Sequence, residues 1–241
     1  MLQEEFLGDY VLDLVLYCSN TMIRRTMSDQ IYVLTSRCSQ GKTEELLRYF
    51  LKRQFDILTD NNDSLQMYAN QSNDFFQLLC RLLSFAHVKR CITSNIHDEL
   101  DRQIVWLKRV SNPTNDILLR GHLNVAKELI QLENFEQKRF YGIEQKLIEQ
   151  LIEEFIFPAS TLLYQLHLKK SNELDMNEIE EPPAPICQSS ASLSAAFDLL
   201  VALATDCYEN LLLIEGYLNK MLHTGKKNST NFVFHLRFST E

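Results

Sequence analysis

The residue pattern closest to a known chemical motif is a glycine, a lysine and a threonine that follow an apolar run. In IYVLTSRCSQGKT, residues 31–43, these residues are Gly41, Lys42 and Thr43. A phosphate-binding P-loop needs another glycine five residues before Gly41, where this chain has Ser36, and no βαβ pattern follows. The sequence therefore favours a loop followed by a helix capped by Thr43, and nucleotide binding is kept only as a third hypothesis for the function.

The cysteines and histidines show no spacing typical of a catalytic or metal site. No C-x-x-C pair occurs among the six cysteines Cys18, Cys38, Cys80, Cys91, Cys187 and Cys207. No two histidines lie three or four residues apart, as paired metal ligands on one helix face would, among His87, His97, His122, His167, His223 and His235. Cys80 and Cys207 lie in apolar helical runs, where burial keeps a thiol neutral. The sequence thus predicts no catalytic residue, no metal and no cofactor.

Two other groups of residues could be taken for functional sites, but a structural interpretation fits them better. Glu153 and Glu154 are adjacent, so on a helix they point about a quarter-turn apart, which favours a solvated face over paired acid-base catalysis. Trp106 is the only tryptophan, and Lys108 and Arg109 follow it closely. In a net-acidic chain, a core indole with basic neighbours in solvent is the better interpretation than a nucleic-acid contact.

The overall composition narrows the class of partner and the compartment. The net charge is -8, so the chain has no basic footprint for nucleic acid or an anionic membrane. The longest apolar runs, such as residues 197–204, are far shorter than the ~20 residues that cross a bilayer, and the N-terminus lacks a basic signal-peptide start. We expect a soluble intracellular protein with reduced thiols, in the cytoplasm or alternatively the nucleus, that binds proteins rather than nucleic acid or membranes.

The elements that must position these residues are helices. Glycine and proline are scarce, at 6 and 5 residues, and apolar residues recur every three to four positions from end to end. We expect Thr43 to cap the third helix, and Asn73 or Asp74 the fourth. The predicted helices span residues 2–18, 21–37, 43–58, 72–88, 96–110, 115–132, 144–157, 158–169 and 191–222, the last broken near Gly216.

The apolar pattern within the helices predicts how they are covered. Residues 96–110 carry their apolar side chains on one stripe, so this helix packs by one face. The run from Leu193 to Leu222 is apolar around more of its circumference. This run is therefore expected to lie between neighbouring elements rather than on the surface.

An acidic, proline-rich stretch divides the chain. Residues 171–185, SNELDMNEIEEPPAP, combine five carboxylates with three prolines, which disfavours a helix. The final segment changes period, because Phe232, Phe234, Leu236 and Phe238 alternate as in a strand. The predicted organisation is a helical body at 1–170, a linker at 171–190, a terminal helical pair at 191–222 and an irregular tail at 223–241.

Helical pairs joined by short loops, without a sheet, are typical of stacked helical hairpins. The predicted fold is therefore all-α, an irregular α-solenoid of the armadillo or HEAT type. A strict repeat of ~40 residues is not visible, and a globular helical bundle is the alternative.

Five separated sequence blocks follow one another along the chain. They are VWLKRV (105–110), RGHLNVAKELI (120–130), LIEEFIFPAS (151–160), PICQSSASLSAAFDLLVALATDC (185–207) and LNKML (218–222). In this order they resemble the fat-facets-type ubiquitin-specific proteases in the helical region before their catalytic domain. The resemblance covers residues 74–222 and, more weakly, 2–60. The resemblance implies an armadillo-like array that carries a papain-like cysteine protease domain and helps engage substrates or regulators.

The sequence departs from this family after Leu222. There the family continues into a catalytic domain that opens with a box close to G-x-T-C-Y-x-N-S, whereas this chain continues with HTGKKNSTNFVFHLRFSTE. No cysteine here lies in such a box, so no catalytic residue is carried over. The leading hypothesis is a non-catalytic scaffold segment of a deubiquitinase, either a truncated product or part of a longer chain. An independent helical adaptor is the alternative, and the oligomeric state is left open.

One matched block contains a proline between two predicted helices. We expect the stretch FPAS to be an architectural corner, with Pro158 in the first turn of the second helix, where its missing amide costs nothing. Phe155, Ile156 and Phe157 are predicted to anchor this corner in the core.

Overall fold

The computed structural model describes residues 2–59, 64–89, 96–110, 115–161 and 184–228. Within these ranges the chain is helical and contains no strand, as the sequence predicted. The α-helices are α1 (Leu2–Tyr17), α2 (Thr21–Arg37), α3 (Gln40–Thr59), α4 (Ser64–Lys89), α5 (Ile96–Arg109), α6 (Asp116–Leu132), α7 (Phe135–Arg139), α8 (Leu147–Gln150), α10 (Ser190–Ala204) and α11 (Tyr208–Asn228). Two π-helical segments adjoin α8, namely η1 (Phe140–Glu144) and η2 (Leu151–Ile156).

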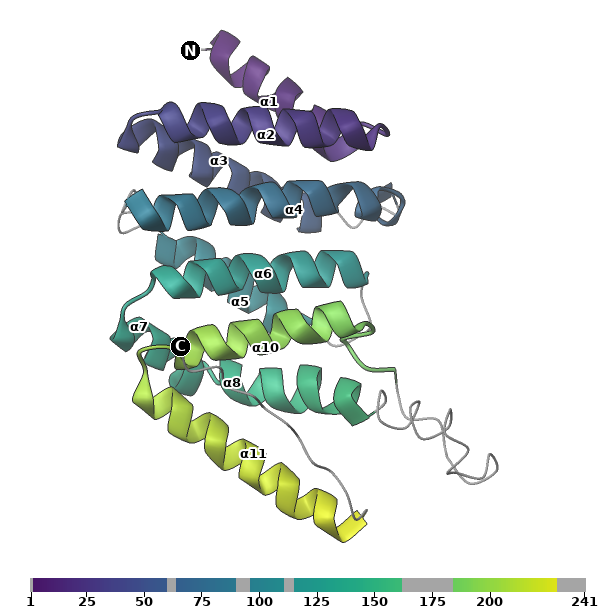
Figure 1. Cartoon of the computed structure of the whole chain (residues 1–241), viewed down its shortest axis with the longest axis vertical. Helices are drawn as coiled ribbons and strands as arrows, with labels where there is room; N and C mark the ends of the chain where they lie inside the picture. Colours follow the sequence, from purple (N-terminus) through teal and green to yellow (C-terminus); the bar gives the residue numbers. More distant parts are fainter. Residues whose placement is uncertain (1, 60–63, 90–95, 111–114, 162–183, 229–241) are drawn as a thin grey trace.

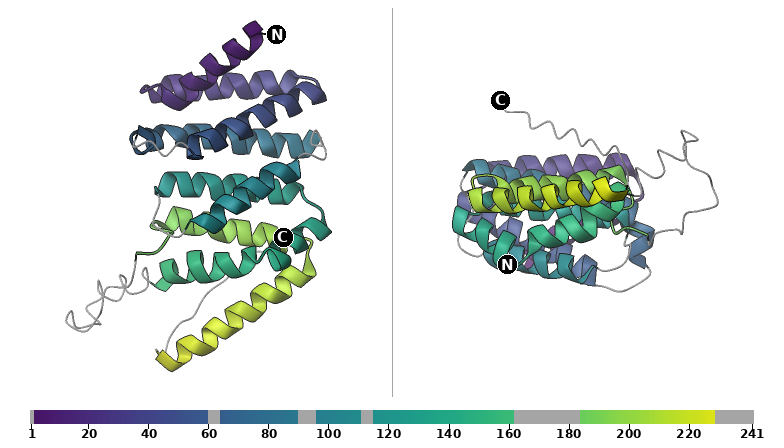
Figure 2. Two further views of the ribbon diagram at one scale, coloured as in Figure 1. Left: turned by 180° about the vertical axis from the view of Figure 1, so that it is seen from behind. Right: turned by 90° about the horizontal axis from the view of Figure 1, so that it is seen from below.

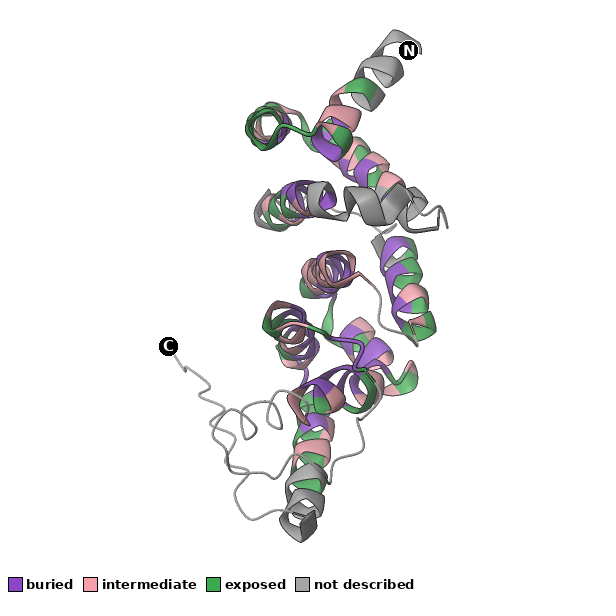
Figure 3. Ribbon diagram, turned by 90° about the vertical axis from the view of Figure 1, so that its right-hand side faces the viewer, coloured by how far each residue is buried: buried purple, intermediate pink, exposed green. Residues whose placement is uncertain are grey.

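The helices form two layers that run along the long axis of the molecule (Figure 1 and Figure 3). The first layer stacks α2, α4, α6 and α10, and the second layer contains α1, α3, α5 and α8. Helices α1 and α2, α3 and α4, and α5 and α6 pack as pairs, while α2 packs on α4, α4 on α6 and α6 on α10. This stacking of helical pairs is the irregular α-solenoid that the sequence predicted.

Helix α6 lies in the middle of the first layer and is buried on two sides. It places Leu119, Leu123 and Leu129 in the core with no exposed surface. A side chain added at Gly121 would overlap the Phe76 ring of α4, so a glycine is needed for the two helices to approach this closely. The helix contacts α4 on one side and α10 on the other.

Side-chain caps fix where several helices begin. Asn20 accepts a hydrogen bond from the Met22 amide at the start of α2 (2.9 Å), and Asn115 accepts one from the Ile117 amide at the start of α6 (3.0 Å). Ser189 and Ser192 form a reciprocal capping box at the start of α10. These oxygens satisfy amides that have no partner inside the helix.

The predicted caps of the third and fourth helices are wrong. Helix α3 begins at Gln40, so Thr43 lies inside it, buried, and its hydroxyl donates to the Thr35 carbonyl oxygen (3.3 Å). Helix α4 begins at Ser64, which places Asn73 and Asp74 in its middle. Residues that often cap helices are also suited to polar contacts between helices, and those contacts determine their role here.

The predicted corner at Pro158 is also wrong. Residues 157–161 continue the helix directly after η2, and the Phe157 amide donates to the carbonyl oxygen of Ile152, five residues earlier. In an α-helix a proline clashes with the carbonyl four residues before it, and the wider π-helical turn relieves this clash. Phe155 and Ile156 are buried as predicted, whereas Phe157 is exposed.

The C-terminal helical run is broken at a different residue from the one predicted. Helix α11 continues through Gly216, and the break lies at Thr205–Cys207, where Asp206 adopts a left-handed conformation with φ 59°. A short aspartate side chain tolerates this conformation. The predicted helix beyond residue 161, most of the linker and the strand-like tail lie outside the described residues.

The described helices also bear on the membrane prediction. None of them has both the length and the apolar composition required to cross a bilayer.

Candidate protein-interaction surface

The glycine, lysine and threonine of the P-loop-like stretch begin a helix. Gly41 and Lys42 lie in the first turn of α3, and only Cys38 and Ser39 separate this helix from α2. Two connecting residues cannot form the loop of successive amides that surrounds a phosphate in a P-loop. The Thr43 hydroxyl is buried and donates to the Thr35 carbonyl oxygen.

Burial makes two thiols poor nucleophiles. It raises the pKa of Cys80 to about 12, and the nearby Glu128 carboxylate adds to the rise. Burial also raises the pKa of Cys187 to about 12. Because the thiolate is the reactive form, both side chains act as small apolar groups in the core. All five described cysteines are free thiols, and the described residues contain no cluster of three or more potential metal ligands.

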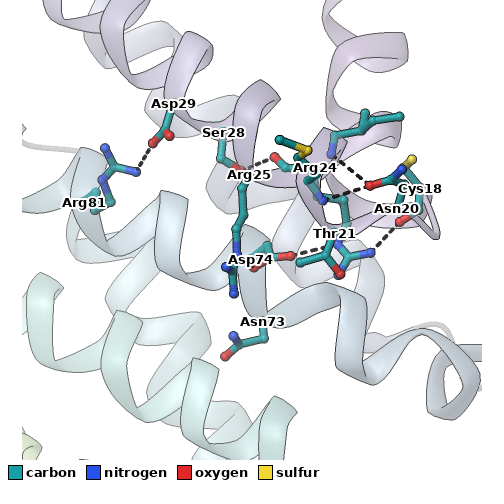
Figure 4. A network of polar contacts seen from close by, with 12 residues as sticks. Cys18, Asn20, Thr21, Arg24, Arg25, Ser28, Asp29, Asn73, Asp74 and Arg81 are labelled. Atoms are coloured by element: carbon teal, nitrogen blue, oxygen red, sulfur yellow. Dashed lines mark hydrogen bonds and ion pairs between the residues drawn. The ribbon is translucent and has the colours of Figure 1, made fainter.

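A buried ion pair joins the first helical pair to the rest of the array (Figure 4). The Arg24 guanidinium of α2 contacts the Asp74 carboxylate of α4 through Nε and Oδ2 at 2.8 Å, and both side chains are almost fully buried. Arg24 Nη1 also donates to the Cys18 carbonyl oxygen (2.6 Å) and the Ser19 carbonyl oxygen (3.2 Å) after α1. One guanidinium therefore holds α1, α2 and α4 together.

A histidine in the middle of the array is buried among aromatic rings. His122 of α6 lies against Trp106 of α5, with ring centroids 4.2 Å apart, and against Phe76 of α4 at 5.2 Å. Its Nδ1 atom donates to Gln103 Oε1 (2.8 Å). Burial lowers the pKa of His122 to about 3, so the ring stays neutral and structural at physiological pH.

The interpretation of Trp106 as a core residue is consistent with this arrangement. Its indole is half-buried and packs against the core, while Lys108 and Arg109 are exposed. Glu153 and Glu154 are exposed as well, as the sequence predicted.

A buried amide attaches α11 to the array. Asn210 Nδ2 donates to the Lys138 carbonyl oxygen at the end of α7 and to the Leu203 carbonyl oxygen in α10, both at 2.8 Å. A side chain at Gly142 of η1 would overlap the Asn210 amide, so the glycine leaves room for it. The Lys138 ammonium donates to the Thr205 carbonyl oxygen (3.0 Å). Four elements, α7, η1, α10 and α11, thus meet at the neutral Asn210 amide.

Most of the described large apolar side chains that are exposed lie on α1, α2, α10 and α11, and Val105 of α5, Phe135 of α7 and Phe157 are exposed as well. At one end of the array the exposed side chains are Tyr10, Tyr17, Met22, Ile23, Val33 and Leu34 of α1 and α2. At the other end they are Val201, Tyr208, Leu211 and Leu212 of α10 and α11. Exposed apolar patches of this kind mark protein-interaction surfaces.

The comparisons with known proteins point to one group of enzymes. The chain is 32% identical over 232 residues to mouse "Ubiquitin carboxyl-terminal hydrolase 9X" and 33% identical over 232 residues to human "Ubiquitin carboxyl-terminal hydrolase 9Y", which covers 92% of this chain in both cases. It is 27% identical over 217 residues to the fly "Probable ubiquitin carboxyl-terminal hydrolase FAF", over 87% of this chain. No family model matches the chain.

This chain is a relative of the fat-facets-type ubiquitin-specific proteases. It spans about 9% of the length of the 9X and 9Y relatives and 7% of the fly relative. The sequence blocks that suggested the fat-facets-type family lie in the stacked helices. RGHLNVAKELI (120–130) lies in α6, and the block at 185–207 contains α10, whose inner residues fill the core. Most residues of the RGHLNVAKELI block are buried.

Sequence reasoning missed two features of this chain. It assigned Asp74 to a helix cap, because its partner Arg24 lies 50 residues away and nothing local pairs the two. It also missed the exposed apolar face of α11. The signal for that face was present, since the run from Leu193 to Leu222 is apolar around much of its circumference.

Proposed function

We propose that the chain is a non-catalytic helical scaffold that binds proteins of the ubiquitin-removal pathway. The observation that carries this proposal is its likeness to mouse "Ubiquitin carboxyl-terminal hydrolase 9X" over 92% of the chain, in a region folded as a helical array. Arrays of stacked helical pairs present long surfaces that suit protein recognition. The exposed apolar residues at both ends supply candidate surfaces.

The non-catalytic part of the proposal is supported by the cysteines. The sequence contains no cysteine within a G-x-T-C-Y-x-N-S box. Burial raises the pKa of Cys80 and of Cys187 to about 12, which disfavours the thiolate that a cysteine protease needs. The proposed partners are ubiquitinated substrates or their regulators and, in a longer polypeptide, a protease domain that the array orients.

A ubiquitin-based covalent probe tests the absence of catalysis. Purified full chain is incubated with ubiquitin that carries a C-terminal propargyl group, beside an active cysteine deubiquitinase as positive control. We expect no adduct on the chain, because the probe reacts only with an aligned, activated thiol. A stoichiometric adduct on any of the six cysteines would contradict the proposal.

Proximity labelling in cells tests the protein-binding part. The full chain, fused to a labelling enzyme, is compared with an unfused labelling enzyme at equal expression. We expect enrichment of ubiquitinated proteins and of enzymes that attach or remove ubiquitin. Equal labelling of these proteins by both baits would rule out a role in this pathway.

A further inference from the structure

One side of α11 is apolar and uncovered. Tyr208, Leu211 and Leu212 expose 67%, 43% and 47% of their surface. Spacings of three and four residues place these side chains on the same side of a helix, and Glu215 and Gly216 continue that side into the next turn. These five residues are called the outer face of α11.

The opposite side of α11 is packed. Asn210 and Ile214 are buried there, and the helix contacts α7, η1, α8 and α10. In the view from below, α11 lies in front of the other described helices (Figure 2). The apolar pattern of this run predicts neighbours on more than one side, and the described structure supplies them on one side only.

Gly216 is an independent sign that something approaches this face. It lies inside a helix of 21 residues, its φ is not positive, and a side chain built on it would meet nothing within 4 Å. Neither the backbone at Gly216 nor the packing of the described residues requires glycine there, although glycine destabilises a helix interior relative to alanine. The missing side chain leaves room for a second backbone to come close.

The stacking of the array and the local charge indicate what the second element is. Neighbouring layers in this molecule are helices packed on helices, so a helix on the outer face would continue the same kind of interface. Glu209 and Glu215 are exposed beside the three apolar side chains. Carboxylates at the rim favour a partner that carries lysine or arginine at matching positions.

We propose that the outer face of α11 binds an amphipathic α-helix of a partner protein. The apolar side of that helix covers Tyr208, Leu211 and Leu212, its backbone crosses at Gly216, and basic side chains beside the apolar stripe pair with Glu209 and Glu215. This inference rests on the proposed protein-binding function and assigns it a surface and a partner chemistry.

The test uses the full chain and a synthetic probe. The probe is a fluorescently labelled amphipathic helix of about 20 residues, with leucines at the a and d heptad positions and lysines at e and g. A second peptide carries glutamates at e and g. Binding is measured by fluorescence anisotropy. We expect saturable binding of the lysine peptide and about tenfold weaker binding of the glutamate peptide, because only the first complements Glu209 and Glu215.

Three variants locate the site. Leu212→Lys is expected to weaken binding of the lysine peptide about tenfold or more, because it places a charge in the apolar contact. Gly216→Leu is expected to weaken binding while it raises the melting temperature, a combination that loss of structure cannot produce. The matched control is Val105→Lys on α5, which is 45% exposed in the wild type, close to the 47% of Leu212, and should leave binding unchanged.

Several outcomes would overturn this inference. They are absence of binding to the wild-type chain, equal binding by wild type and Leu212→Lys, or loss of binding in Val105→Lys instead. Self-association in sedimentation experiments that Leu212→Lys abolishes would identify a second copy as the occupant. Binding that appears only after removal of residues 229–241 would identify that segment as the occupant.

Failure of this inference can be distinguished from failure of the proposed function. If the Leu212→Lys bait still enriches ubiquitin-pathway proteins in cells, the function stands and the outer face of α11 is not the surface. If the wild-type bait enriches none of them, the proposed function itself fails.

Discussion

The middle of the array and its last helix place glycines in opposite environments. In α6, Gly121 lies directly against the Phe76 ring, and the helix is covered by α4 and by α10. In α11, Gly216 faces open space, beside Leu212 and Tyr208, which are exposed. Contacts among the described residues explain the first glycine but not the second. A glycine that destabilises its helix, and that no contact among the described residues requires, is a better guide to a binding surface than a glycine required by core packing.

The attachments of the two regions differ in charge as well. The first helical pair is joined to the middle by the buried ion pair of Arg24 and Asp74. Helix α11 is joined by the neutral Asn210 amide, which donates to the carbonyl oxygens of Lys138 and Leu203. Breaking the charged contact should lower the free energy of unfolding more than breaking the neutral one, because removal of one partner leaves an uncompensated charge in the core.

The largest effect is expected for Asp74→Ala. This variant leaves the Arg24 guanidinium buried without its carboxylate, so the free energy of unfolding should fall by about 3–5 kcal/mol. Urea denaturation followed by circular dichroism measures the change. The control is Asp29→Ala, which removes an exposed contact with Arg81 (2.8 Å) and should cost less than about 1 kcal/mol. If Asp74→Ala does not fold, Asp74→Asn gives a milder version. Equal effects of Asp74→Ala and Asp29→Ala would show that the buried pair contributes no more than a surface pair.

The next effect is expected for Asn210→Leu. The leucine cannot donate, so the Lys138 and Leu203 carbonyl oxygens lose their contact with α11, at a cost of about 2–4 kcal/mol. Hydrogen exchange measures where the loss falls. We expect α11 amides to exchange faster while α4 and α6 stay protected, because α11 is held at one side only. Asn219→Leu, on the exposed side of the same helix, is the control and should change exchange little. Uniform loss of protection across the array would mean that α11 is not a separate unit.

The positions of the helices were largely predictable because they depend on local periodicity. Residues 21–37 were predicted as a helix and form α2, and residues 96–110 closely match α5. The starts of α3 and α4 were not predictable, because Thr43 and Asp74 make contacts with α2 that local sequence does not reveal. A polar residue near a helix start can cap it or bind a distant element, and only the tertiary arrangement decides.

The candidate surface was predictable only in part. The apolar run that contains Leu211 and Leu212 was visible, and it indicated that the helix has neighbours. Which side of the run lacks a neighbour depends on how α11 docks through Asn210, and that docking joins residues far apart in the chain. By contrast, the sequence alone shows that none of the six cysteines lies in a G-x-T-C-Y-x-N-S box.

The pH dependence of stability probes the middle of the array. Burial lowers the pKa of His122 from 6.5 to about 3, so the unfolded state binds a proton below pH 6.5 that the folded state does not. This contribution to the free energy of unfolding is complete above pH 6.5 and falls as the pH is lowered, by about 2–3 kcal/mol at pH ~4.5. His122→Phe keeps a ring that cannot titrate, and its stability should fall less steeply. Parallel curves for the two proteins would mean that protonation of His122 is not opposed by burial.

Alanine at the two glycines tests the opening comparison most directly, and Gly216→Ala is expected to have the smallest effect of all. Gly216→Ala should raise the free energy of unfolding by about 0.5–1 kcal/mol, because alanine loses less backbone entropy in a helix and its methyl group meets nothing. Gly121→Ala should lower it by about 1–3 kcal/mol, because the methyl group would overlap the Phe76 ring. Thermal and urea denaturation measure the change in the free energy of unfolding of each variant. Changes of opposite sign in the free energy of unfolding would show that alanine stabilises a helix where it has room. They would also show that the clash with the Phe76 ring outweighs this gain at Gly121. A loss of stability in both would mean that the outer face of α11 is already occupied within the chain, which would remove the room that a partner helix needs.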